Sequence, residues 1–360
     1  DDSGGKPRQY LDGLLKIPFG IYRQEEILTL MNDIKTEFYD LTTNYLQLTS
    51  DLTDKRMIPS YKDYTSAEIM HHIKKYNTTL DKVSKKDLNN MAKDINKYIK
   101  LNKISFDKID YLANKKEHLK SSIIEFLKQN SNYSPPLYRG IYSKFEKIQN
   151  YIVNVKSTLD ESVYGHEKAK QQICRIVGQW INGEQNGYCF GFEGPPGLGK
   201  TSIAKYGISR CLKDHEGKSR PFAMIQMGGD CQGSTLSGHN YTYVGSNWGN
   251  IVQILIDKKC MNPIIFIDEI DKVSKTEHGK EIVGILTHML DPTQNDSFQD
   301  KYFSGIDIDL SRVLFVLSYN DANLIDKILL DRVHRVKFTS LSLDEKVVIA
   351  NKHILPEAYK

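Results

Sequence analysis

Gly194-Pro-Pro-Gly-Leu-Gly199-Lys200-Thr201 is the stretch of this 360-residue chain that decides its fold class. It fits the pattern G-x-x-x-x-G-K-[ST], follows an apolar run at Tyr188–Phe192 and opens a helical pattern over Ser202–Leu212. Glycines allow backbone angles that turn successive N–H groups inward, and these donors and the positive end of the following helix hold phosphates. The strand–loop–helix context favours a phosphate loop over an ordinary Gly-Pro turn.

The residues of this loop have separate expected roles. Lys200 is expected to neutralise the β- and γ-phosphates of a nucleotide, and the Thr201 hydroxyl to bind Mg²⁺. The rest of the loop is expected to line the nucleotide, namely Gly194, Pro195, Pro196, Gly197, Leu198, Gly199 and Ser202.

Two acids follow a second apolar run, Ile264–Ile267. The carboxyl ends of strands in an open parallel sheet form the ligand edge, so Asp268 and Glu269 are expected beside the phosphate loop. We expect Asp268 to hold Mg²⁺, directly or through water, and Glu269 to polarise the attacking water. An isolated Asp-Glu pair is usually a solvated helix start, but its place after a buried strand favours the catalytic interpretation.

Polar residues also follow the next two elements. Asn320 comes after the run Val313–Leu317, and its amide is expected to orient the water or touch the γ-phosphate. The alternative is an asparagine that ends a strand in a turn. Arg332 is expected on the next helical segment, facing away from its own nucleotide and serving a neighbouring subunit as an arginine finger. Arg335 is a weaker candidate.

The finger assignment for Arg332 has an alternative, an ion pair with Asp331 or Asp326 of the same chain.

A separate feature is the polar loop Gly238–Gly245, in which glycines flank Tyr243 and Val244. Exposed apolar tips of this kind usually contact a partner. In a ring of subunits they would grip a polypeptide in the central channel, and the alternative is an aromatic side chain folded back on its own domain.

The chain changes character along its length. Residues 160–360 alternate short apolar runs, including Phe222–Met227, with helical patterns, which predicts an α/β fold with a parallel sheet. Residues 22–160 look all-helical. Two stripes with alternating spacings of four and three residues could pair as an antiparallel hairpin: Ile27, Met31, Ile34, Phe38, Leu41, Tyr45, Leu48, and Ile141, Phe145, Ile148, Ile152, Val155, Leu159.

Shorter patterns lie between and before these stripes. A helix is expected over residues 10–17, ended by Pro18 and Gly20, and Thr65 with Glu68 reads as a capping box. Ser134-Pro-Pro136 marks a break. Two further stripes are expected to form core and carry no chemistry: Leu88, Met91, Ile95, Ile99, and Ile109, Leu112, Leu119, Ile123, Phe126.

Composition excludes several classes of protein. The net charge of +4, from 49 basic and 45 acidic residues, does not by itself indicate nucleic acid. Five cysteines without a C-x-x-C pair disfavour a zinc site or disulfide framework and indicate a reducing compartment, cytoplasmic or otherwise, with organellar or viral origin left open. No run is long and apolar enough for a bilayer. Since the chain opens with Asp1, we expect a fragment or a processed product.

Together, the motifs resemble the AAA+ ATPase module of Lon-type ATP-dependent proteases, over about residues 8–22 and 155–360. Beyond the phosphate loop, the resemblance rests on these residues: Tyr10-Leu-Asp-Gly-Leu-Leu-Lys-Ile-Pro18-Phe, Tyr164-Gly165, Gly238-His239, Tyr241-Thr-Tyr243-Val-Gly245, Ile267-Asp-Glu-Ile-Asp-Lys272, Leu290-Asp-Pro-Thr-Gln-Asn295 with Phe298, Asp300 and Tyr302, Asp309-Leu-Ser311, Leu330-Asp-Arg332, and Glu345-Lys346 followed by His353-Ile-Leu-Pro356.

The resemblance implies an ATP- and Mg²⁺-dependent unfoldase that works as a hexameric ring and threads unfolded polypeptide through its pore. It implies an adenine pocket at Tyr164 and Gly165, Asn320 as γ-phosphate sensor, Arg332 as trans-acting finger and Tyr243–Val244 as pore loop. The implied domains are 1–24 before the ATPase, 25–155 as a helical insertion, 156–340 as the AAA+ domain and 341–360 as the start of a helical lid.

Three departures from the family pattern stand out. The helical residues 25–150 replace a much shorter connection, and one extra residue separates Asn320 from Arg332. The chain stops at Lys360, so the lid arginine and a Ser-Lys protease domain would lie in sequence outside it. The alternatives are a stand-alone remodelling ATPase, a vestigial ATPase that serves as an interaction scaffold, and a nucleic-acid motor. Intact Lys200, Asp268, Glu269 and Asn320 argue against the scaffold.

Overall fold

The computed structural model describes residues 5–48, 65–70, 85–111, 115–130, 139–182, 189–228, 233–351 and 355. The chain divides into two compact units. One unit comprises Asp1–Glu26, Ile152–Trp180 and Glu184–Lys360, and the other Ile27–Tyr151 and Ile181–Gly183. The first unit is therefore built from segments that are far apart in the sequence, and it holds all the candidate site residues.

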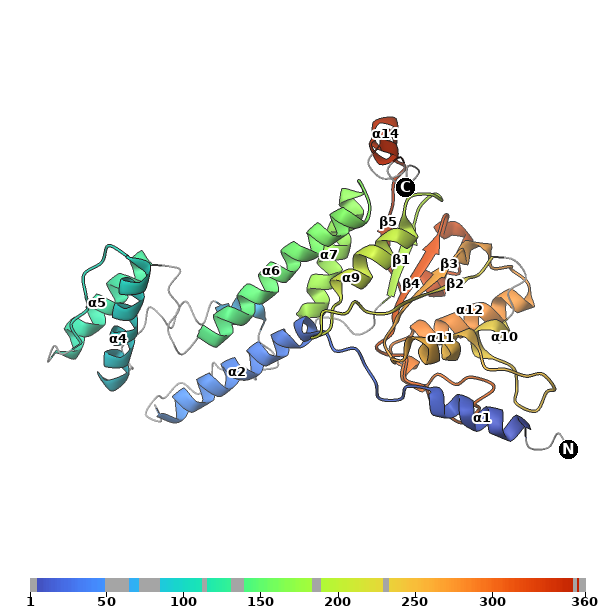
Figure 1. Cartoon of the computed structure of the whole chain (residues 1–360), viewed down its shortest axis with the longest axis horizontal. Coiled ribbons are helices and arrows are strands. Elements are labelled where there is room, and N and C mark those ends of the chain that lie inside the picture. Colours follow the sequence, from blue (N-terminus) through green and yellow to red (C-terminus); the bar gives the residue numbers. More distant parts are fainter. Residues whose placement is uncertain are drawn as a thin grey trace. The chain divides into compact units, whose positions relative to one another are not determined.

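The larger unit is built on a five-stranded parallel sheet in the order β2-β3-β4-β1-β5 (Figure 1). The strands are β1 (Cys189–Glu193), β2 (Phe222–Gln226), β3 (Ile264–Asp268), β4 (Leu314–Tyr319) and β5 (His334–Lys337). The predicted α/β fold is confirmed. Four strands lie within two residues of their predicted positions, although Tyr188 lies outside the described residues. The predictions missed β5, a short edge strand in which only Val336 is buried.

Helices and short helical turns precede, connect and follow the strands. In chain order they are α7 (Glu167–Ile181), α8 (Lys200–Ser202), η4 (Ile203–Ile208), α9 (Ser209–Cys211), α10 (Gly233–Ser237), α11 (Asn250–Lys258), η5 (Ile270–Lys272), α12 (Glu277–Leu290), η6 (Asn295–Ser297), η7 (Ala322–Leu324), α13 (Lys327–Leu330) and α14 (Leu343–Ile349). The helix expected over Ser202–Leu212 is present, but its middle, η4, has the wider π winding. Gly207 lies in this turn, where a Cβ would come within 3 Å of Leu159 and Ser162.

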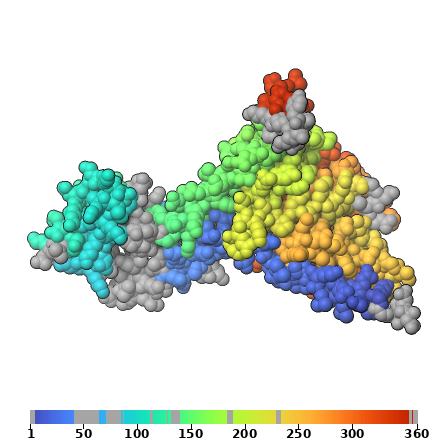
Figure 2. All heavy atoms as spheres, viewed as in Figure 1, coloured from blue at the N-terminus to red at the C-terminus, as the bar shows by residue number. Residues whose placement is uncertain are grey.

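The N-terminal segment is an integral part of this unit. Helix α1 (Gly5–Lys16) ends just before Pro18, as predicted, and Ile17 lies in the core. Asn262 then brackets Arg23, accepting from its backbone N–H and donating to its carbonyl, both at 2.7 Å. In Figure 2 the dark-blue segment lies along the outside of the yellow and orange residues.

The same segment ends in a buried ion pair. The Arg220 guanidinium donates two hydrogen bonds, of 2.6 and 2.7 Å, to the two carboxylate oxygens of Glu25, and both side chains are buried. Breaking a buried pair of this kind by removing one partner costs about 3–5 kcal/mol, because the other charge stays uncompensated. This pair therefore fastens the segment before residue 27 to the sheet-bearing unit.

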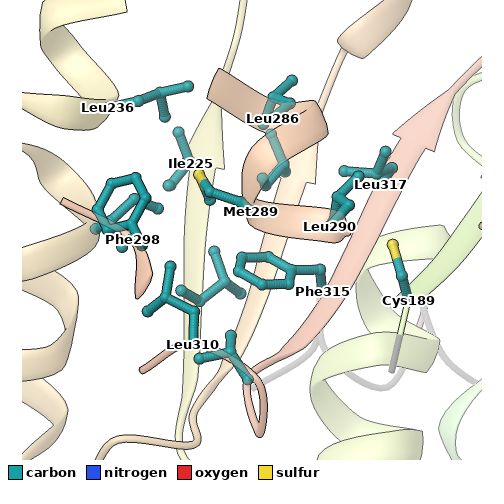
Figure 3. Packing of buried hydrophobic residues seen from close by; sticks show 14 of the residues in the cluster. Cys189, Ile225, Leu236, Leu286, Met289, Leu290, Phe298, Leu310, Phe315 and Leu317 are labelled. Carbon is teal, nitrogen blue, oxygen red and sulfur yellow. The ribbon is translucent and has the colours of Figure 1, made fainter. Parts of the chain in front are cut away.

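The core of the unit lies where α12 packs on the sheet. Leu286, Met289 and Leu290 of α12 pack against side chains of β2 and β4, with Phe298 and Leu310 closing the cluster (Figure 3). Strands buried on both faces carry continuous apolar runs, which is why β3 and β4 could be recognised in the sequence.

The smaller unit is helical in its described part. It contains α2 (Glu26–Leu48) from Ile27 onward, a turn over residues 66–70, α4 (Lys85–Asn102), α5 (Lys116–Gln129) and the first half of α6 (Arg139–Ser162). The capping box is confirmed: the Glu68 carboxylate accepts from the Thr65 backbone N–H at 2.8 Å, and the Thr65 hydroxyl accepts in return from the Glu68 N–H.

The predicted apolar stripes form core with two corrections. On α4 the fully buried residues are Leu88, Ala92 and Ile95, whereas the predicted Met91 and Ile99 are only partly buried. On α6, Ile152 is exposed, so that stripe is interrupted. Some residues of the predicted stripes, and the predicted break, lie outside the described residues or have side chains that are not described. They are Leu41, Tyr45, Leu48, Leu112 and Ser134-Pro-Pro136.

None of the helices in the described part of the chain combines the length and apolar character needed to cross a membrane.

Candidate nucleotide-binding site

The phosphate loop leaves the carboxyl end of β1 and leads into α8. Its three glycines have φ values of +153° at Gly194, +76° at Gly197 and +79° at Gly199, a range that residues other than glycine rarely adopt. At Gly194 a Cβ would also lie 2.4 Å from the Phe338 carbonyl oxygen. Leu198 is buried and anchors the loop, while Pro195 and Pro196 are exposed. The three glycines thus give the backbone the conformation that a phosphate cradle requires.

Lys200 links this loop to the end of β4. Its buried ammonium group donates to the Gly194 carbonyl at 2.6 Å, the Tyr319 carbonyl at 2.9 Å and the Asn320 amide oxygen at 3.2 Å. Burial lowers the pKa of Lys200, against the opposing effect of Asp268 and Asp271. Among the described residues no carboxylate forms an ion pair with it. An anionic ligand in the cradle would supply the missing negative charge, so the site fits a phosphate group.

The two acids stand at the end of β3. Asp268 closes the strand and accepts a 2.9 Å hydrogen bond from the Glu269 N–H. Glu269 has φ +59°, a left-handed conformation that is uncommon outside glycine. Its carboxylate pairs with Lys272 and accepts a weak 3.5 Å hydrogen bond from Gln226. The Lys272 contact lowers the pKa of Glu269, so the carboxylate is ionised at neutral pH, as a base requires.

Asn320 follows β4 directly, and its side chain meets Lys200 as described above. Its backbone N–H donates to the Asp271 carboxylate at 3.0 Å, which ties the end of β4 to the turn after β3. Sequence reasoning missed Asp271. The signal was present, because Asp271 is the third acid of Ile267-Asp-Glu-Ile-Asp-Lys272.

The segment before α7 lies against the phosphate loop. Tyr164 is half-buried, and Gly165 has φ +73° and lies close to Leu341 and Glu345. Val163 sits so near Gly199 that a Cβ there would come within 3.2 Å of it. Tyr164 and Gly165 are therefore beside the loop, where an adenine pocket was expected. Thr201 and Ser202 are half-buried in the first turn after the loop.

Arg332 differs in detail from the prediction. It lies in a turn just after α13, and its ion pair is with Asp291 at 2.8 Å. Neither Asp331 nor Asp326 is that partner. Asp326 instead caps α13, accepting from the Ile328 N–H at 2.8 Å. Arg335 lies on β5 and pairs with Glu193 at 2.7 Å, so it braces the two neighbouring strands.

The loop after α10 exposes its predicted tip. The Tyr243 side chain is 62% exposed and Val244 is fully exposed. The aromatic residue that does fold back is Tyr241, which packs on Tyr10 and Tyr302 with ring centroids 5.3 and 5.5 Å apart. Lys6 of α1 donates to the Tyr243 carbonyl at 2.6 Å.

Asp300 fixes the base of this loop. Its carboxylate accepts 2.8 Å hydrogen bonds from the N–H groups of Gly249 and Tyr302. Burial raises the pKa of Asp300 to about 6. The backbone just after the loop is thus held by Asp300, and the tip is held by Lys6 through a backbone carbonyl, while the Tyr243 and Val244 side chains stay in solvent.

Comparisons with known proteins agree with this geometry. The family "ATPase family associated with various cellular activities (AAA)" matches residues 190–341. A Lon protease homolog of Acanthamoeba polyphaga mimivirus is 38% identical over 272 residues, which is 74% of this chain and 26% of that protein. The mitochondrial Lon protease homolog of Saccharomyces cerevisiae is 40% identical over 234 residues, 64% of this chain and 20% of that protein.

The chain contains a Lon-type AAA+ ATPase module. The Lon protease of Campylobacter concisus, 36% identical over 61% of this chain, agrees with that assignment. The chain spans about a quarter or less of the length of these relatives. The Lon-type module is an ATP-hydrolysing enzyme, and its α/β fold is the one that the motifs predicted.

Proposed function

We propose that this Lon-type module binds Mg²⁺-ATP at the phosphate loop and hydrolyses it at the interface between two copies of the chain. The observation that carries the proposal is the position of Lys200, whose ammonium group joins the glycine-lined loop to Asn320 at the end of β4. A phosphate chain lying in the cradle would meet this ammonium group and the loop N–H groups together.

The donor set also fits a magnesium ion that arrives with the nucleotide. The described residues contain no cluster of three His, Cys, Asp or Glu side chains that could hold a metal by itself. Mg²⁺ at nucleotide sites takes one or two protein ligands and completes its shell with water and phosphate oxygens. Thr201 and Asp268 would be these ligands, and the ion would neutralise charge on the phosphates.

The remaining residues divide the chemistry of hydrolysis. Glu269 would accept a proton from the attacking water, and Asn320 would orient that water against the γ-phosphate. Glu269 must first leave Lys272, whose pairing with it is exposed to solvent and therefore weak. Tyr164 and Gly165 would hold the base, and Arg332 would act on the nucleotide of the neighbouring copy.

The exposed loop would couple hydrolysis to a polypeptide substrate. In a closed ring of copies, a hexamer in this proposal, Tyr243 and Val244 would line the central opening and pull an unfolded chain through it. Their exposure and the anchoring of the loop at Asp300 and Lys6 support this role. The module would then be the motor of an ATP-dependent protease.

The proposal includes the domain boundaries expected from the sequence. Residues 1–24 precede the ATPase, 25–155 form a helical insertion, 156–340 form the AAA+ domain and 341–360 begin a helical lid. For the insertion we propose a helical hairpin, supported by the 2.6 Å ion pair between Lys144 of α6 and Glu37 of α2.

Replacing Tyr243 tests whether this loop couples ATP hydrolysis to the unfolding of a polypeptide. Tyr243→Ala should slow the ATP-driven unfolding of a tailed fluorescent protein about tenfold or more, the loss typical of a truncated aromatic contact, and leave basal ATP hydrolysis nearly unchanged. Tyr39→Ala removes another exposed tyrosine, from α2, and is the matched control. Unfolding at the wild-type rate in Tyr243→Ala would rule out the loop as the gripping element.

A further inference from the structure

We infer that Asp291 is a positioning residue for Arg332, fixing the arginine side chain for its action on the neighbouring subunit's nucleotide. The inference rests on the proposed trans role of Arg332. It gives a purpose to the motif Leu290-Asp-Pro-Thr-Gln-Asn295, which the site described above leaves unused.

The Asp291 carboxylate is held rigidly on both oxygens. One oxygen accepts hydrogen bonds from the Thr293 backbone N–H at 3.0 Å and from the Thr293 hydroxyl at 2.8 Å. The other oxygen accepts from the Arg332 guanidinium at 2.8 Å. The Asp291 carbonyl also accepts from the N–H groups of Gln294 and Asn295. The turn that ends α12 therefore presents one carboxylate oxygen in a fixed place.

Arg332 is held by this oxygen and by a backbone carbonyl of helix α13, which precedes it. Its second terminal nitrogen donates to the Ile328 carbonyl at 3.1 Å, while Nε is buried and forms no hydrogen bond in the described structure. A guanidinium group has five N–H donors, so these two contacts and the buried Nε leave two terminal N–H groups for other acceptors. The side chain is 27% exposed. The guanidinium group is thus held in a fixed orientation and keeps N–H donors that form no hydrogen bond within the described part of the chain. An arginine finger needs such donors to bind a phosphate anion.

Stability alone does not explain the pair. With 27% of the Arg332 side chain and 15% of the Asp291 side chain exposed, the pair is only partly screened by water and also stabilises the fold, so the choice of partner is what points beyond stability. Nearer acids are present: Asp331 is adjacent in sequence, and Asp326 is used as a helix cap. The arginine instead reaches across to the end of α12, 41 residues away in sequence. The Arg332 contact, followed by those of Thr293, lowers the pKa of Asp291 to about 2, so the carboxylate is charged at neutral pH.

A double-mutant cycle tests the inference on the full chain. Asp291→Ala should lower the turnover of ATP hydrolysis by about 10- to 100-fold, the scale of a misplaced catalytic group, with nucleotide affinity unchanged. In the Arg332→Ala background the same change should have no further effect, because the two residues act as one unit. Asp331→Ala is the matched control and should keep wild-type turnover.

Mixing separates positioning of the finger from damage to the subunit's own site. Asp291→Ala chains mixed with Glu269→Gln chains should regain activity, because each intact hydrolytic site would receive a finger from the other chain. Asp291→Asn, with its thermal unfolding measured, replaces Asp291→Ala if the latter does not fold. Wild-type turnover in the Asp291 variant, additive losses in the cycle, or no recovery on mixing would each overturn the inference. If Arg332→Ala itself keeps full activity, the trans role fails instead.

Discussion

A chain carrying Glu269→Gln is expected to bind ATP with near wild-type affinity and to hydrolyse it at least about 100-fold more slowly, the scale of a lost general base. The physical reason is that an amide of the same shape cannot accept a proton from water. Glu269 follows Asp268 at the end of β3, and its carboxylate is ionised at neutral pH. Turnover and nucleotide affinity should be measured on the same preparation.

The control for this variant is another glutamate that is accessible to solvent and paired with a lysine, but has no expected part in the reaction. Glu281 of α12 is a partly exposed carboxylate that pairs with Lys301 at 2.7 Å. Glu281→Gln should hydrolyse ATP at the wild-type rate. If Glu269→Gln did so as well, Glu269 would not be the base.

Removal of the finger should have an effect of similar or larger size. Arg332→Ala is expected to lower turnover by about 1000-fold, the lower end of the range measured for arginine fingers. The loss should spare nucleotide binding, because in the described structure the hydrogen bonds of Arg332 go to Asp291 and Ile328 and not to the phosphate loop.

If Arg332 acts on the nucleotide of a neighbouring subunit, mixtures of two inactive variants should regain activity. Arg332→Ala chains keep their own base, and Glu269→Gln chains keep their finger. Each variant alone should be nearly inactive, while an equal mixture should regain activity at interfaces that combine one intact part from each. A mixture as inactive as its two components would show that Arg332 does not act across an interface. Arg335→Ala, which breaks a strand-bracing ion pair with Glu193, is the matched arginine control.

Strands could be predicted from the sequence where both faces are buried, because burial requires apolar residues. β3 and β4 are buried on both faces, so each is a continuous apolar run between turn signals. β5 is an edge strand of four residues in which Val336 is the one apolar side chain, and nothing in so short a pattern separates it from a loop. The joining of residues 1–26 to the sheet also depends on tertiary contacts such as Glu25 with Arg220.

Of the candidate site, the backbone shape of the loop at residues 194–199 could be predicted. Its conformation requires glycine at fixed places, so the residue types indicate the shape, and nucleotide binding there stays a prediction. The partners of the other residues could not be predicted. Asp271 reaches Asn320 and Asp291 reaches Arg332 across long sequence distances, and an acid carries no local signal of the group it will meet.

The loop after α10 shows the same limit. Sequence patterns indicated an exposed aromatic tip, and Tyr243 is exposed. Which neighbouring tyrosine would fold back depends on the aromatic cluster around Tyr302, which forms only when α1 and the segment after α12 meet.

Calorimetric titration of the chain with ATP and Mg²⁺ tests the central claim most directly, since every other role depends on a nucleotide in the phosphate loop. We expect one binding event per chain, and its loss in Lys200→Ala, because the ammonium group that joins the loop to β4 is then missing. Lys205→Ala, which changes a lysine in the next helical turn, should bind as the wild type does. No heat with the wild-type chain, or equal binding by Lys200→Ala, would contradict the account.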